Sequence, residues 1–91
     1  MLDLSSEGMR KEIQAFSQRL RALTDELQEH SKLSETNRTL LNQIQQHKDR
    51  LETKLSTAER EGNWNSIKRE FGEDWNSLVV DAATLETQLY E

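Results

Sequence analysis

Residues 9–27, MRKEIQAFSQRLRALTDEL, carry the pattern that decides the fold. Their apolar side chains recur in alternating steps of four and three residues. This average spacing of about 3.5 keeps one stripe of a slightly underwound helix facing a partner helix. The stripe consists of Met9, Ile13, Phe16, Leu20, Leu23 and Leu27. The segment therefore predicts an amphipathic helix with one apolar face.

The same spacing continues through residues 30–58. Three polar positions (His30, Ser34 and Asn37) interrupt it, and it resumes as Leu41, Ile44, Lys48, Leu51, Leu55 and Ala58. Because no glycine or proline marks a turn at the polar positions, we favour one continuous helix over residues 9–60, in which a buried polar layer fixes the register. The alternative is a break within residues 30–37, with Ser34 or Thr36 capping a second helix.

A turn and another helix are expected after residue 60. Gly62 suits a helix end, and Asn63 suits the capping position of the helix that follows. Residues 64–90 then place eight apolar side chains on one helical face: Trp64, Ile67, Phe71, Trp75, Leu78, Ala82, Leu85 and Leu89. Residues 1–8 are expected to be a short lead-in, in which Ser5 or Ser6 caps the first helix. The turn is assigned to residues 61–63.

These elements predict an all-α protein in which a long helix folds against a shorter antiparallel helix, as a helical hairpin or coiled coil. Within the chain, we expect packing among Leu41, Ile44, Leu51, Leu55, Trp64, Phe71, Trp75 and Leu78. The stripe from Met9 to Leu27 would then lie uncovered. The alternative is a compact three-helix bundle of residues 9–30, 35–60 and 64–90, which resembles small adaptor domains in architecture.

The composition agrees with long helices. Only 33% of the 91 residues are apolar, against roughly 45–50% in a typical globular domain. Proline and cysteine are both absent, so uninterrupted helix is favoured, and disulfides and thiolate chemistry are excluded.

Charge and hydropathy exclude several classes of partner. Residues 1–60 are electrically balanced, and the whole net charge of −5 lies in residues 61–91. An acidic segment of this kind would be repelled by phosphate backbones and by anionic lipid, so we expect no nucleic-acid partner. No apolar run approaches the ~20 residues of a membrane span, and no signal peptide is visible. We therefore expect no membrane insertion and a cytoplasmic protein.

Residues that could support catalysis or metal binding are few. His30 and His47 lie seventeen residues apart, which is too far for one helix to bind one metal ion through both. Glu26 and His30 share a helical face, but we interpret them as an ordinary exposed pair rather than half of a metal site. We find no phosphate-binding loop and no catalytic triad order. We therefore expect no enzyme, no cofactor, no metal and no small-molecule substrate.

A short repeat occurs in the last third of the chain. Trp64-Asn-Ser-Ile67 recurs eleven residues later as Trp75-Asn-Ser-Leu78, a spacing that places both indoles on one helical face. We interpret the rings as filling the contact between helices; the alternative is an exposed aromatic stripe that docks a partner.

Residues 62–78, with Gly62-Asn63-Trp64 followed by Phe71 and Trp75, resemble the opening of CsbD-like bacterial stress proteins and a segment of small paired-tryptophan coiled-coil proteins. The chain departs from the CsbD pattern at Trp75-Asn-Ser-Leu78, where that family has Trp-Gly-Lys-Leu. The resemblance implies a stress-associated protein and transfers no site residue.

The function expected from the residues is a non-enzymatic interaction or scaffold role. The uncovered apolar side chains of this stripe, each worth ~1.5–3 kcal/mol on burial, would drive association. The stripe Met9, Ile13, Phe16, Leu20, Leu23 and Leu27 is therefore the predicted partner-binding segment. The expected partner is a second copy of the chain, another helical protein, or both. A CsbD-like stress protein and a compact three-helix adaptor domain are the alternatives.

Overall fold

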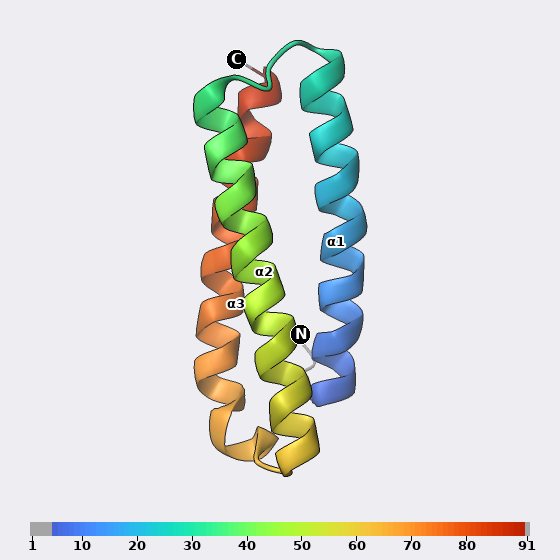
Figure 1. Ribbon diagram of the computed structural model, residues 1–91, viewed down its shortest axis with the longest axis vertical. Helices are drawn as coiled ribbons and strands as arrows, with labels where there is room; N and C mark the ends of the chain where they lie inside the picture. Colours follow the sequence, from blue (N-terminus) through green and yellow to red (C-terminus); the bar gives the residue numbers. More distant parts are fainter. Residues whose placement is uncertain (1–4, 91) are drawn as a thin grey trace.

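The computed structural model describes residues 5–90. They form three α-helices, α1 (Ser6–Glu29), α2 (Glu35–Glu61) and α3 (Trp64–Thr87), followed by a short 3-10 helix, η1 (Gln88–Tyr90). The helices run alternately up and down, so α1 and α3 are parallel to each other and antiparallel to α2 (Figure 1). No strand occurs among the described residues, and the all-α prediction is confirmed.

Helix α1 begins within the expected lead-in. The Ser5 hydroxyl accepts a hydrogen bond from the backbone N–H of Gly8 at 3.0 Å, which satisfies one of the free donors of the first turn. Ser5 is therefore the capping residue of the two candidates, and the helix starts at Ser6. Residues 1–4 of the expected lead-in lie outside the described residues.

The favoured continuous helix over residues 9–60 is not formed, because α1 ends at Glu29 and α2 begins at Glu35. Ser31 adopts a left-handed backbone with φ 56°. The N–H of Ser31 donates to the carbonyl of Gln28, and the N–H of Lys32 donates to the carbonyl of Leu27. This pair of bonds is the Schellman motif, which satisfies the last carbonyls of a helix. A serine here does what glycine usually does, so the usual sequence signal for a break was missing.

The three polar stripe positions all belong to this connection. His30 caps the end of α1. The Ser34 hydroxyl caps α2 by accepting from the N–H of Asn37 at 3.2 Å, and the Asn37 amide donates to the carbonyl of Lys32 at 2.8 Å. The polar residues therefore connect two helices and do not form a buried layer inside one.

The turn after α2 lies at residues 62 and 63, within the predicted range. Gly62 has φ 72°, and its N–H donates to the carbonyl of Ala58. Asn63 stands at the capping position of α3, but its side chain makes no capping hydrogen bond. The predicted capping position of Asn63 is therefore confirmed, but the hydrogen bond that an asparagine side chain usually makes there is not formed.

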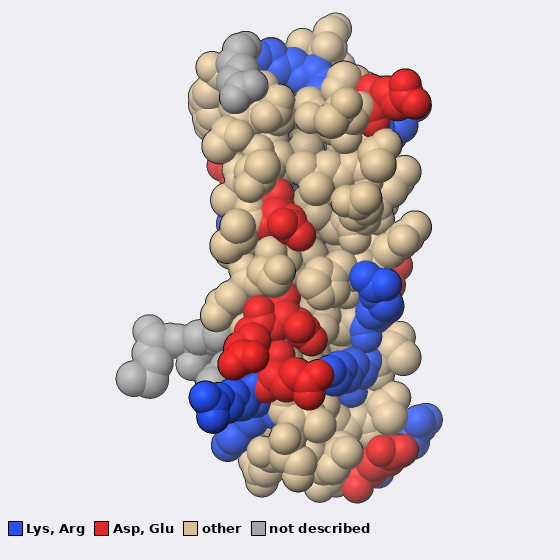
Figure 2. Space-filling model, turned by 90° about the vertical axis from the view of Figure 1, so that its left-hand side faces the viewer, with Lys and Arg blue, Asp and Glu red and all other residues tan. Residues whose placement is uncertain are grey.

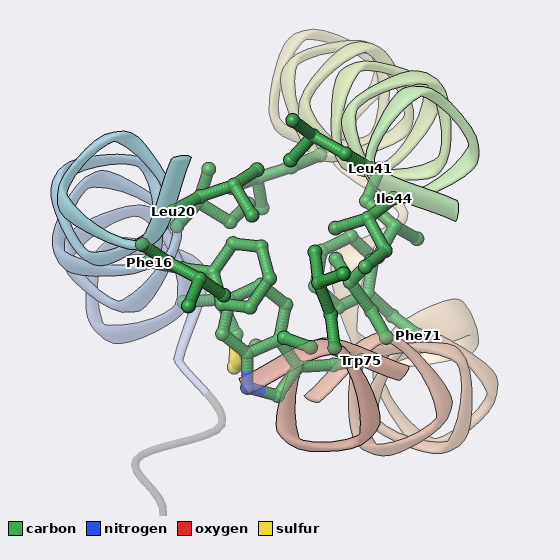
Figure 3. Packing of buried hydrophobic residues seen from close by; sticks show 14 of the residues in the cluster. Phe16, Leu20, Leu41, Ile44, Phe71 and Trp75 are labelled. Carbon is green, nitrogen blue, oxygen red and sulfur yellow. The ribbon is translucent and has the colours of Figure 1, made fainter. Parts of the chain in front are cut away.

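All three helices contribute to one apolar core (Figure 3). The six stripe residues of α1 are 0–6% exposed, so the expectation that this stripe lies uncovered is wrong. The reason is the break after Glu29, which folds α1 back against α2 and α3. The buried cluster comprises Met9, Ile13, Phe16, Leu20, Leu23, Leu27, Leu41, Ile44, Leu51, Leu55, Phe71, Trp75, Leu78, Ala82 and Leu85.

The residues predicted to pack within the chain lie in or against this core. Leu41, Ile44, Leu51, Leu55, Phe71, Trp75 and Leu78 are buried, and Trp64 is partly buried against them. Trp64 meets Phe71 edge-to-face at 5.1 Å, and Trp75 meets Phe16 of α1 at 5.3 Å. In the described structure the two indoles therefore fill helix contacts, as the first interpretation expected.

Candidate interaction surface

The predicted partner-binding stripe faces the inside of the molecule. Phe16 and Leu20 point from α1 toward Trp75 and Leu41 on the other two helices (Figure 3). While α1 is packed in this way, the stripe cannot touch another protein. Any surface that the packed form offers to a partner must therefore be built from residues on the outside.

Exposed ion pairs join the edges of α1 to its two neighbours. Arg10 pairs with Glu59 of α2, and Arg19 pairs with Glu86 of α3. Each of these side chains is between 33% and 54% exposed, and exposed pairs contribute only about 0–1 kcal/mol. They fix which edge of α1 meets which neighbour, while the apolar core supplies most of the stability.

A shallow groove runs between α1 and α2. Its first part has a volume of ≈ 440 Å³ and has Ile13 and Leu55 among its lining residues, together with the polar side chains of Gln14, Gln18 and Arg21. A second hollow shares Ser17 and Arg21 with it and continues along the helices to Gln45 and Lys48. Most of the lining is polar, which is typical of a solvated surface.

Lys48 occupies a stripe position of α2 but keeps its charge. Its ammonium lies 3.1 Å from a carboxylate oxygen of Glu52 and 3.3 Å from one of Asp49, with the side chain 17% exposed. Burial alone would lower the pKa of Lys48, but hydrogen bonds and attraction from Glu52 and Asp49 raise that pKa above its ordinary value. Lys48 therefore packs its aliphatic stem and carries a fixed charge at the groove edge.

A smaller groove between α1 and α3 is more apolar. Ala15 and Phe16 line it from α1, and Trp75 and Val79 line it from α3. The Arg19–Glu86 ion pair connects the same two helices.

Charge is distributed unevenly over the face formed by α2 and α3 (Figure 2). One half carries Lys54, which lies 3.1 Å from Glu70 and 3.8 Å from Asp74 across the two helices. The other half is mostly without Lys, Arg, Asp or Glu. No such residue lies between Arg38 and Lys48 in the sequence, and Asp81 alone lies between Asp74 and Glu86.

We refer to this second half as the neutral face. Its exposed side chains include Thr39, Gln43 and Gln46 of α2, and Ser77, Val80 and Thr84 of α3. Val80 is 62% exposed and is one of two large apolar side chains exposed to this degree in residues 5–90, the other being Tyr90. Charge depletion marks the centre of protein–protein interfaces more reliably than bulk hydrophobicity does.

The titratable side chains of the described residues do not gather into a candidate metal site. Across residues 5–90, no three His, Asp or Glu side chains come together as metal ligands. His30 lies exposed at the end of α1, and His47 is half-buried on α2. None of the helices in this range combines the length and hydropathy needed to cross a bilayer.

Sequence reasoning missed the neutral face. The signal was present, because residues 39–46 contain only uncharged side chains and residues 75–80 do as well. Its significance depends on α2 and α3 lying side by side, with Thr39–Gln46 and Ser77–Thr84 on the same part of the molecule. Only the fold supplies that information.

The segment that resembles CsbD-like proteins, residues 62–78, forms the second turn and the first part of α3. Phe71 and Trp75 of this segment are buried core residues, so a requirement for helix packing accounts for both. The resemblance stays a prediction. No family model, no curated protein and no solved structure matches this chain.

Proposed function

We propose that this protein is a non-enzymatic helical interaction module whose neutral face binds a helix of another protein. The observation that carries the proposal is the charge depletion of one half of the α2–α3 surface, with the exposed Val80 on it. In this proposal the compact three-helix form is the working state, and the Met9–Leu27 stripe serves the core.

The dimensions of the face suit a helical partner. On α2 the uncharged part of this face lies between Arg38 and Lys48. At a helical rise of about 1.5 Å per residue these two residues lie about 15 Å apart, the length of nearly three helical turns. A partner helix with charged ends and one basic side chain that reaches Asp81 would fit, because it could bury Val80 without burying an unpaired charge.

Variants of exposed residues test the proposal. The tagged chain and its variants are used as baits in extract of the source cells, and bound proteins are quantified by mass spectrometry. Val80→Lys places a charge in the neutral face, whereas Ala22→Lys makes a similar change at an exposed position of α1. We expect a protein captured by the natural chain to be lost at least about tenfold with Val80→Lys and retained with Ala22→Lys.

Circular dichroism of both variants confirms that they remain helical. The proposal fails if the natural chain captures no protein above background. It also fails if Val80→Lys and Ala22→Lys retain the same proteins equally.

A further inference from the structure

We propose that α1 can leave its own core and exchange with α1 of a second copy of this chain. The exchange straightens the connection between α1 and α2. It brings the Met9–Leu27 stripe into contact with α2 and α3 of the other copy. This inference is independent of the neutral face, which stays on the surface in either form.

The first observation is the spacing of the stripe across the connection. From Leu27 the steps to His30, Ser34, Asn37 and Leu41 are three, four, three and four residues. If the connection always folded α1 back onto α2, the stripe spacing would not have to continue through it. Because the spacing is kept, a helical connection would place the stripes of α1 and α2 in one line on a single helix. That helix would run over residues 6–61 and be about 84 Å long.

The second observation is the local chemistry of the connection. No glycine or proline occurs in residues 28–40, so nothing there prevents helix. Ser31 is the one non-glycine residue with positive φ in the described range, a conformation that an L-residue adopts at a cost. A straight connection removes that cost, and in exchange it gives up the Ser34 cap and the hydrogen bond from Asn37 to Lys32.

The third observation identifies the occupant. A straightened chain exposes two apolar surfaces: the stripe of α1 and the part of α2 and α3 that α1 had covered. A second copy covers both at once, because it carries the same two surfaces. Two long helices lying antiparallel keep α1 antiparallel to α2 and parallel to α3, as in the single chain (Figure 1). Every core contact of α1 is then remade between copies, while α2 and α3 of each copy stay packed on each other, which is the usual basis of domain exchange.

The ion pairs at the edges of α1 allow a direct test. The first variant carries Arg10→Glu and Arg19→Glu, which reverse the charge of the two side chains on α1. The second variant carries Glu59→Arg and Glu86→Arg, which reverse the charge of their partners on α2 and α3. Each variant alone places like charges opposite each other, both in the monomer with α1 packed in its own chain and in an exchanged dimer of two identical chains. An exchanged dimer of one chain of each variant has opposite charges at all four positions.

The two variants are unfolded together, refolded at high protein concentration, and examined by native mass spectrometry. We expect the mixed dimer to exceed each dimer of a single variant by more than about tenfold, against about twofold for random pairing. If either variant fails to fold alone, helicity should appear on mixing. Monomers alone, or dimers in random proportions, would overturn the proposal.

Variants of the connection provide a second test. Ser31→Ala combined with Ser34→Ala disfavours the turn and favours helix, so this double variant should have a higher dimer fraction than the natural chain. Ser31→Gly favours the turn and should lower that fraction. No change in either variant, or changes in the opposite directions, would contradict the proposed straightening.

Discussion

The ring of Phe16 packs edge-to-face against the indole of Trp75, with centroids 5.3 Å apart and the ring planes inclined by 67°. Phe16 belongs to α1 and Trp75 to α3, which are the first and last helices of the chain. The two rings are 5% and 4% exposed. This contact closes the core on the side of the bundle where α1 and α3 meet directly.

Removing the ring of Phe16 should destabilise the whole fold. Phe16→Ala leaves a cavity beside Trp75 and loses the buried area of the ring, so we expect a loss of about 3–5 kcal/mol in the free energy of unfolding. Urea unfolding followed by circular dichroism measures this change. Tyr90→Ala is the control, because Tyr90 is 83% exposed and its loss should change stability by less than about 0.5 kcal/mol. Equal effects of the two substitutions would contradict the packing described.

The two left-handed residues should respond oppositely to substitution. Ser31→Gly relieves a left-handed serine at φ 56° and should stabilise the protein by up to about 1 kcal/mol. Gly62→Ala introduces the same kind of cost at φ 72°, where an added Cβ meets no atom within 4 Å, and should destabilise by about 1 kcal/mol. Thermal and urea unfolding measure both changes. A stabilising Gly62→Ala would show that this backbone does not adopt positive φ.

The capping residues of α2 and α3 should differ in importance. Ser34→Ala removes the acceptor for the N–H of Asn37 and should cost about 1 kcal/mol. Asn63→Ala removes a side chain that makes no capping hydrogen bond, so we expect a smaller effect. Comparable losses at both positions would indicate that Asn63 caps α3 after all. Equilibrium unfolding in urea of the two variants decides between these outcomes.

Lys48 should make stability depend on pH in the alkaline range. The neighbouring Glu52 and Asp49 raise its pKa in the folded chain above 10.5, the ordinary lysine value. A raised folded pKa gives a stabilising contribution that is complete below the unfolded value and is lost as pH rises through the folded value. Above about pH 10.5 the free energy of unfolding of the natural chain should therefore fall relative to that of Lys48→Met. A difference that stays constant from pH 9 to pH 12 would refute this interaction.

Most of the secondary structure was predictable because it depends on local patterns. The spacing of the apolar residues gave the helical faces, and Gly62 marked the second turn through its need for positive φ. The residues that pack between α2 and α3 were predictable for the same reason: a stripe at helical spacing must find a partner surface.

The position of α1 was not predictable in this way, because the connection is made by residues that also suit helix. Ser31 takes the left-handed position without being glycine, and Ser34 caps α2 only if the helix has already ended. The continuous helix and the broken helix differ in a few hydrogen bonds at the connection and in whether the apolar stripe of α1 is buried within the chain. The exposed neutral face was missed for a further reason, since it requires two segments distant in the sequence to lie together.

The central claim is that a single chain closes its own core, with Phe16 against Trp75. Nuclear Overhauser effects between these rings test it most directly, in an equimolar mixture of isotope-labelled and unlabelled chains that are refolded together at low protein concentration. We predict contacts between the two rings within the labelled chain and none in the spectrum filtered for contacts between chains. Ring contacts found only in the filtered spectrum, or in neither spectrum, would contradict the claim.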